Sequence, residues 1–278
     1  MNLLLIKAAI MGIVEGVTEF LPISSTGYLI LSGDLMDFWS KDKRDLFIVF
    51  IQLGAILAVI YDYWGRLWKA FLGLLTGQAD GMTNPRGLGL ALIIATLPVM
   101  VMGFLFKDFI TQRLFHPLVV ATMLILGALI IIFVEKYPRR IKAVEAEHID
   151  LTMAIKIGLA QCLALIPGTS RSGSTIIGGL WFGASRKAAT EFSFFLGIPV
   201  IIGAALLDLL DKKDVLQSND WKVLGVGTLV SFVVALLCIR FMVAWVSKKD
   251  FMIFAWLRII TGLVVLVAYF MFGYQIQG

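Results

Sequence analysis

The sequence predicts an all-α polytopic membrane protein, and three observations lead to this fold class. Hydrophobic residues make up 59% of the 278 positions, and the mean hydropathy is +0.92. Only 15% of the residues are charged, against roughly 25% in ordinary globular proteins. The apolar residues are gathered in runs long enough to cross a bilayer, which takes about 20 residues per helix.

Six apolar runs are uninterrupted and are predicted to be transmembrane helices: 46–64, 87–106, 117–135, 190–210, 223–246 and 251–273. Two others, 3–38 and 152–185, are broken midway by proline, glycine and hydroxyl residues. Non-helical backbone at membrane depth is tolerated only when it is buried in protein or lines a water-filled cavity. We therefore predict that each broken run is a re-entrant helical hairpin. The alternative is a full span kinked at Pro22 or Pro167.

The two broken runs resemble each other, which indicates an internal repeat. Residues 12–27 read GIVEGVTEFLPISSTG and residues 158–173 read GLAQCLALIPGTSRSG. The alignment pairs Glu15 with Gln161, Ser24 with Ser170, and Ser25 with Arg171. Each half would contain one hairpin and three spans, so the second half would be inverted relative to the first. We predict one membrane domain, with a first repeat at 1–140 and a second at 150–278.

The charge distribution predicts membrane topology rather than nucleic-acid binding. The net charge of +5 is spread over several short loops, a pattern typical of headgroup contact and orientation signals. A slight excess of basic residues favours the side of loops 65–86, 136–150 and 247–250 as cytoplasmic. Cys162 and Cys238 lie inside apolar runs and do not indicate a disulfide framework. The hydrophobic N-terminus is interrupted by acidic residues and is expected to be mature protein rather than a cleaved signal.

Glu15 and Glu19 are the first candidates for chemistry. They are four residues apart, so on a helix they share one face. Ionisable groups inside an apolar helix are costly, and their presence there indicates function. Such a pair binds a divalent cation, acts as a general base, or does both. The alternative is a structural role as interfacial carboxylates or as partners for basic groups.

The two polar turns are candidates for binding an anion. Ser24–Gly27 follows Pro22 at a predicted helix start, and the unpaired N–H groups of a helix N-terminus favour negative charge. Ordinary N-capping is the alternative. Arg171 lies in the matching turn, and its planar guanidinium suits phosphate, although it could serve as a structural partner for the glutamates. Both histidines, His116 and His148, lie in other loops. A hydroxyl or water activated by a glutamate is therefore expected, with arginine stabilising a phosphoryl group.

The strings EGVTEFLPISSTG and PGTSRSG, in this order, resemble the undecaprenyl-diphosphate phosphatase family linked to bacitracin resistance. The resemblance covers nearly the whole chain, including 52–58 and 185–194. It implies a hydrolase that removes the terminal phosphate of undecaprenyl diphosphate and recycles the lipid carrier for peptidoglycan synthesis. It also implies a bacterial cytoplasmic (inner) membrane protein with an outward-facing site and a divalent cation, Mg²⁺ or Ca²⁺. The rival hypothesis is a transporter or flippase of a phosphorylated prenyl lipid, which would bind without reacting.

The resemblance also assigns residues. It implies catalytic roles for Glu15, Glu19, Ser25 and Arg171, with the two glutamates also holding the metal. The remaining polar positions of the two turns are taken as substrate-binding: Ser24, Thr26, Gly27, Tyr28, Thr169, Ser170, Ser172, Gly173 and Thr175. Tyr28 stands where the family usually has histidine, and a phenol is a poor proton shuttle near neutrality. Expected partners are the lipid substrate and membrane lipids but no nucleic acid, and homodimer formation is left open.

Overall fold

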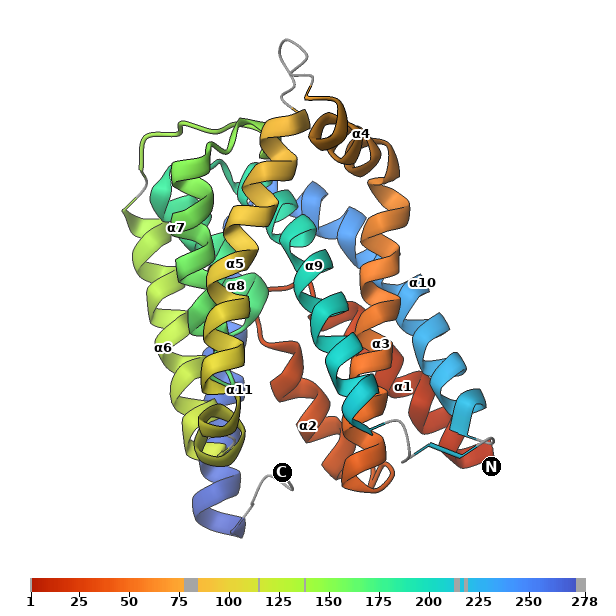
Figure 1. Ribbon diagram of the computed structural model, residues 1–278. Coiled ribbons are helices and arrows are strands. Elements are labelled where there is room, and N and C mark those ends of the chain that lie inside the picture. Colours follow the sequence, from red (N-terminus) through yellow and green to blue (C-terminus); the bar gives the residue numbers. More distant parts are fainter. Residues whose placement is uncertain are drawn as a thin grey trace.

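The computed structural model describes residues 2–77, 85–114, 116–137, 139–212, 216–217 and 220–273. In these ranges all the regular elements are helices, as predicted. Six of them are long and apolar enough to cross a membrane, and they match the six predicted runs: α3 (Lys41–Asp62), α5 (Pro85–Phe109), α6 (Pro117–Lys136), α9 (Arg186–Lys212), α10 (Asp220–Val246) and α11 (Met252–Phe272). The chain is therefore a multi-pass helical membrane protein (Figure 1).

Each broken run folds as two short helices joined by a turn. The first run gives α1 (Asn2–Thr18) and α2 (Ser25–Leu35). The second gives α7 (Leu151–Gln161), the 3-10 segment η3 (Cys162–Leu165) and α8 (Arg171–Phe182). Pro22 and Pro167 lie in the turns, because proline removes a backbone donor and clashes with the preceding helical turn.

The two helix pairs approach the middle of the molecule from opposite ends (Figure 1). α1 starts at the lower end, and α2 returns to that end, where the Lys7 ammonium donates to the Asp37 carbonyl at 3.2 Å. α7 starts at the upper end and α8 returns there, where the Lys142 N–H donates to the Gly183 carbonyl at 2.7 Å. The two turns consequently lie against each other at mid-height.

Close packing of backbones holds the first helix pair in place. α1 lies along α10, and a Cβ on Gly16 would be only 2.8 Å from the Ala235 nitrogen. Small residues allow the two backbones to approach this closely. Inside a membrane, helices associate through such van der Waals packing, because the hydrophobic effect does not drive them together there. The turn after α1 is anchored by Phe20, which is fully buried and packs edge-on against Phe194 of α9, with ring centroids 5.0 Å apart.

The three loops that were predicted to lie on one side of the membrane are found at the upper end of the molecule. Arg66 of α4 (Trp64–Thr76) donates to both carboxylate oxygens of Glu147 at 2.7 Å, within the 3-10 segment η2 (Ala146–His148). The Phe251 N–H donates to Glu135 at 3.0 Å. Loops 65–77, 139–150 and 247–250 therefore share one end, as predicted, while 78–84 and 138 lie outside the described residues.

Helix α4 was not expected, because 65–86 was interpreted as a loop. Its exposed side carries Trp64 and Trp68, whose rings stack with centroids 5.8 Å apart. Aromatic residues of this kind are enriched at the membrane–water interface, which explains an apolar helix too short to span. A short π-helical segment, η1 (Ile110–Leu114), continues α5 at the lower end.

The Arg66–Glu147 contact makes stability at the upper end depend on pH. Burial alone would raise the pKa of Glu147, but the hydrogen bonds and charge of Arg66 outweigh it and hold that pKa below its usual range. A carboxyl whose pKa is lower in the folded state stabilises the protein above its unfolded pKa of about 4.3. That contribution is lost as the pH falls through the folded-state pKa.

We predict that Glu147→Gln lowers the thermal midpoint in detergent at pH 7 and flattens its decline below about pH 4.3. The expected shift at pH 7 is about 2–4 °C, corresponding to a loss of about 1 kcal/mol. Glu145→Gln is the matched control, because the side chains of Glu145 and its partner Lys187 are 39% and 40% exposed and solvent-accessible pairs contribute little. Identical pH profiles for wild type and Glu147→Gln would contradict the prediction.

Candidate functional site

Two serines with unusual backbone conformations mark the turns. Ser24 has φ 78° and stands at the N-cap position of α2, while Ser170 has φ 75° and caps α8 with its side chain. These are the positions that the internal alignment paired. A non-glycine residue with positive φ costs about 1–3 kcal/mol and is retained where the surrounding structure requires it. Here it directs the first turns of α2 and α8 toward one another.

Between the turns lies a cavity of about 210 Å³. Its polar walls come from both turns and from Gln52 of α3, and its apolar walls come mainly from α9 and from η3 with the turn that follows it. The polar residues that line it are Glu19, Ser24, Ser25, Thr26, Gln52, Ser170, Arg171 and Ser172. Two helix N-termini that face one space favour an anionic ligand.

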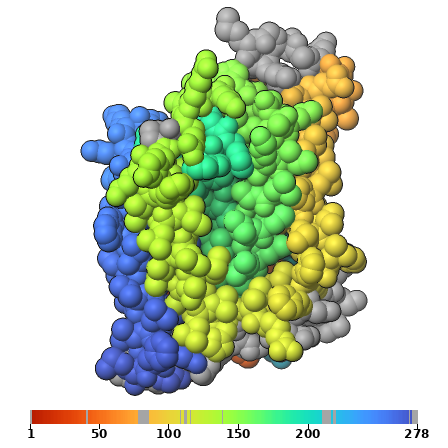
Figure 2. All heavy atoms as spheres, turned by 90° about the vertical axis from the view of Figure 1, so that its left-hand side faces the viewer, coloured from red at the N-terminus to blue at the C-terminus, as the bar shows by residue number. Residues whose placement is uncertain are grey.

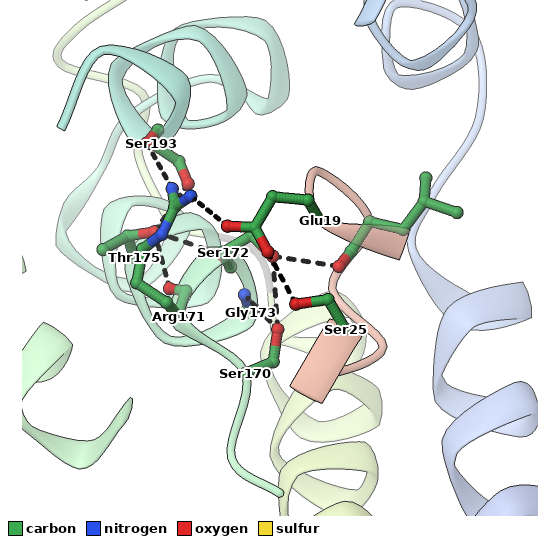
Figure 3. A network of polar contacts seen from close by, with 9 residues as sticks. Glu19, Ser25, Ser170, Arg171, Ser172, Gly173, Thr175 and Ser193 are labelled. Atoms are coloured by element: carbon green, nitrogen blue, oxygen red, sulfur yellow. Dashed lines mark hydrogen bonds and ion pairs between the residues drawn. The ribbon is translucent and has the colours of Figure 1, made fainter. Parts of the chain in front are cut away.

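Glu19 connects a hydroxyl and an arginine across the cavity (Figure 3). The Ser25 hydroxyl donates to Glu19 Oε2 at 2.6 Å, and Arg171 Nη2 donates to Glu19 Oε1 at 2.7 Å. Glu19 is 6% exposed, so little solvent screens these contacts. The structure thus brings together three of the four residues to which catalytic roles were assigned.

Arg171 is oriented by α9. Its Nη1 donates to the Ser193 carbonyl at 2.9 Å, and the Ser193 hydroxyl bonds the Thr175 hydroxyl at 2.6 Å. Gly197, one turn along α9, leaves space for the guanidinium, since a Cβ there would be 2.7 Å from both Nη atoms. These contacts fix the guanidinium beside Glu19.

The second turn is also closed by its own serines. Ser170 accepts the Gly173 N–H at 3.0 Å as a helix cap, and the Ser172 hydroxyl donates to the Leu21 carbonyl at 2.9 Å (Figure 3). The bond to Leu21 ties the second turn directly to the first. Ser170 and Ser172 therefore have structural roles in addition to lining the cavity.

Glu15 lies behind Glu19 rather than on the cavity wall. The Glu19 N–H donates to the Glu15 carbonyl at 2.9 Å, so the helical spacing that was predicted for the pair is present. Glu15 is fully buried, and neither carboxylate oxygen has a hydrogen-bond partner among the described residues. Its counterpart Gln161 is equally buried, and its amide is likewise without a partner there. A buried carboxylate that accepts no hydrogen bond is costly unless it is protonated or bound to a cation.

Other predicted binding residues face away from the cavity. The Tyr28 hydroxyl bonds Thr261 of α11 at 2.7 Å. Thr169 and Gly173 line a separate, mostly apolar hollow of about 290 Å³ beside α6. In Figure 2, α8 is visible in a recess between α6 and α7. Gly27 lies near Val120 of α6 rather than on the wall of the cavity between the turns.

Sequence reasoning missed two residues that shape the site. Ser193 orients Arg171, but one serine in an apolar helix gives no distinctive signal. Arg258 of α11 is 1% exposed and donates to backbone carbonyls of both turns. A single arginine within a run as apolar as 251–273 was a usable signal, because ionisable residues in spans are functional candidates.

The fold and cavity define a class: a multi-pass membrane protein with a buried polar cavity that carries a hydroxyl–carboxylate pair beside an arginine. The chain belongs to the family described as Bacitracin resistance protein BacA, which it matches over residues 8–264. It is 69% identical over 277 residues to the Undecaprenyl-diphosphatase of Psychrobacter cryohalolentis, with 99% of each chain covered. It is 60% identical over 266 residues to the Undecaprenyl-diphosphatase 1 of Acinetobacter baylyi, with 95% of this chain and 96% of the relative covered.

We predict that Gly197→Ala displaces the Arg171 guanidinium and destabilises the protein by about 1–3 kcal/mol, the usual cost of overpacking. Thermal unfolding in detergent measures the effect. Gly203→Ala is the matched control on the same helix, because its Cβ would meet only Met100 at 3.8 Å. It should be neutral or slightly stabilising. Equal midpoints for the two variants would show that Arg171 is not held tightly at Gly197.

Proposed function

We propose that this chain hydrolyses undecaprenyl diphosphate to undecaprenyl phosphate and inorganic phosphate. The observation that carries the proposal is the Ser25–Glu19–Arg171 contact, which places a hydroxyl, a base and a cation in one buried cavity. The names of the relatives support the same substrate. The reaction would return the lipid carrier to peptidoglycan synthesis and give resistance to bacitracin.

In this proposal Glu19 is the general base and Ser25 the nucleophile. Glu19 accepts the Ser25 proton along the 2.6 Å hydrogen bond while Ser25 Oγ attacks the terminal phosphorus. The P–O bond to the bridging oxygen breaks, and undecaprenyl phosphate leaves with that bonding pair. Glu19 passes its proton to the departing undecaprenyl phosphate and is a base again. A water that gives its proton to Glu19 then attacks the phosphorus of the phosphoserine, the bond from phosphorus to Ser25 Oγ breaks, Oγ takes the proton back from Glu19, and inorganic phosphate is released. The alternative is direct attack by a water that Glu19 activates, with Ser25 only binding the phosphate.

Arg171 stabilises the charge on the transferring phosphoryl group. The fixed position of its guanidinium, held by Ser193, avoids reorganisation during the reaction. The N-terminal turns of α2 and α8 contribute N–H dipoles aimed at the same space. A transporter of a phosphorylated lipid would need an anion site but no hydroxyl bonded to a carboxylate. The Ser25–Glu19 hydrogen bond therefore favours a hydrolase over a transporter.

The carboxylates also fit a divalent cation. Glu15 is buried without a hydrogen-bond partner in the described chain, so a cation would satisfy a group that is otherwise costly. No cluster of three or more His, Cys, Asp or Glu side chains suited to a metal occurs among the described residues. Glu15 and Glu19 would hold Mg²⁺ or Ca²⁺ together with phosphate oxygens and water. When bound, the ion would neutralise phosphate charge.

We further propose that 1–140 and 150–278 are inverted repeats whose helix pairs are re-entrant. The positive φ values at Ser24 and Ser170 and the opposite directions of the two pairs support this arrangement. The upper end, which carries the basic loops, would face the cytoplasm, and the site would open to the outer side of the bacterial inner membrane. All four proposed catalytic residues come from one chain, so a homodimer is not required for chemistry.

We predict that Arg171→Ala and Glu19→Ala each lower the rate of phosphate release from purified undecaprenyl diphosphate by at least about 10²-fold. Ser25→Ala separates the two mechanisms. A nucleophilic Ser25 predicts a comparable loss and a phosphoserine detectable by mass spectrometry after rapid quenching. Near-wild-type rates in Arg171→Ala and Glu19→Ala would overturn the proposed function.

We predict that Glu15→Gln raises the Mg²⁺ concentration needed for half-maximal activity by about tenfold or more. The amide keeps the size of the side chain but removes the negative charge that the cation would neutralise. Titration of activity against Mg²⁺ after treatment with a chelator measures the effect. An unchanged titration midpoint would exclude Glu15 as a determinant of metal affinity.

A further inference from the structure

Arg258 occupies a position that the proposed mechanism does not use. It lies in α11 and is the largest side chain of the described residues that is fully buried. Its Nε donates to the Leu124 carbonyl at 3.1 Å and its Nη2 to the Met123 carbonyl at 3.0 Å, both on α6. Its Nη1 donates to the Pro22 carbonyl at 3.1 Å and its Nη2 to the Gly168 carbonyl at 3.2 Å.

The last two bonds join the two turns. Pro22 precedes Ser24 and Ser25, and Gly168 precedes Ser170 and Arg171. Both carbonyls lie where the helical hydrogen-bond ladder is interrupted, so they need hydrogen-bond donors from elsewhere. One rigid guanidinium supplies both. This one planar group therefore fixes the position of the two turns relative to each other, and with it the relative position of Ser25 and Arg171.

The charge of Arg258 is not matched by a carboxylate. All four of its hydrogen bonds go to backbone carbonyls. Within the described ranges it makes no hydrogen bond or ion pair with an Asp or Glu side chain. A Cβ on Gly173, in the first turn of α8, would lie 3.3 Å from its Nη1. A positive charge therefore stands directly behind a helix N-terminus that faces the cavity, and it adds to the potential there.

Arg258 does not reach the cavity itself. It lines the apolar hollow beside α6, on the other side of the second turn from Glu19. It therefore acts through the turns rather than on the substrate. Gly127 of α6 makes the arrangement feasible, because a Cβ at this position would collide with the guanidinium.

We propose that Arg258 is a positioning residue that clamps the two turns together through Pro22 and Gly168 and supplies positive charge behind the anion site. The clamp fixes the distance between the hydroxyl and the arginine that the reaction needs. The kinetic part of its test rests on the proposed phosphatase activity, and the structural part does not.

The first test compares Arg258→Gln with Arg258→Lys in purified protein, using phosphate release from undecaprenyl diphosphate. Lysine keeps the charge but cannot span both carbonyls, so we expect kcat to fall about tenfold with KM little changed. Glutamine loses both functions, and a misplacement of about 1 Å can cost about 10²-fold. We therefore expect kcat to fall about 10²-fold and KM to rise. Wild-type kinetics in Arg258→Gln would overturn the proposal.

The second test is independent of activity. Hydrogen–deuterium exchange without substrate follows the amides of Ile23 and Thr169, which are bonded within the two turns to Leu21 and Ile166 at 2.8 and 3.1 Å. Both should exchange at least about tenfold faster in Arg258→Gln, because the clamp has been removed. Arg44→Gln is the matched control: Arg44 is 5% exposed and pairs with Asp34 away from the turns. It should lower the thermal midpoint and leave these two amides unchanged.

Gly127→Ala keeps the proposal testable if Arg258→Gln does not fold. It moves the guanidinium without removing its charge, and Gly225→Ala is the control, since a Cβ at Gly225 would meet nothing within 4 Å. Faster exchange at Ile23 and Thr169 in Gly127→Ala alone supports the clamp, and equal exchange in the two variants overturns it. If the wild type releases no phosphate, the proposed function fails while the exchange data still decide the role of Arg258.

Discussion

The ion pair between Glu19 and Arg171 is the contact on which the rest of the site depends. Its partners are 152 residues apart in sequence and come from turns that enter the molecule from opposite ends. Removing one partner of a buried pair leaves an uncompensated charge and costs about 3–5 kcal/mol. The pair therefore couples the packing of both turns to the geometry at Ser25, and neither turn can shift without affecting the other.

The backbone around this pair is organised by a second constraint. Interrupted helices expose carbonyls and N–H groups at a depth where water is scarce. Here those groups are satisfied by serine hydroxyls, by a helix cap and by the guanidinium of Arg258. The same polar residues that make the turns possible also line the cavity or lie directly behind it. Structural and functional requirements on the turns thus coincide, which explains why so many hydroxyl residues are concentrated there.

Most of the architecture could be predicted from sequence because long apolar runs and breaks by proline have direct physical meaning. The six spans and the positions of α2 and α8 followed from these patterns. Helix α4 was missed, because an apolar stretch of 13 residues lacks the length of a span. The pairing of Glu19 with Arg171 was anticipated only as an alternative to phosphate binding, and the structure is compatible with both. Tyr28 bonds Thr261, and Thr169 lines the hollow beside α6. Both placements depend on tertiary packing, which a local sequence pattern does not reveal.

The internal alignment has a further consequence at the positions where the two halves differ. Ser24 and Ser170 share a positive φ of 78° and 75°, while Ser25 and Arg171 at the next position have different chemistry. The shared conformation is therefore a property of the turn, and the difference in side chains creates a hydroxyl on one side and a cation on the other. The two unlike copies together bring both groups to Glu19.

In the arrangement described above, the arginine is already engaged by a carboxylate of the protein itself. A ligand that seeks Arg171 must compete with Glu19, which holds it at 2.7 Å. Glu19 gives the guanidinium one oxygen and Ser25 the other, so a diphosphate with several oxygens could share the guanidinium and still contact the helix ends, which chloride could not. The internal pair thus acts as a selectivity threshold.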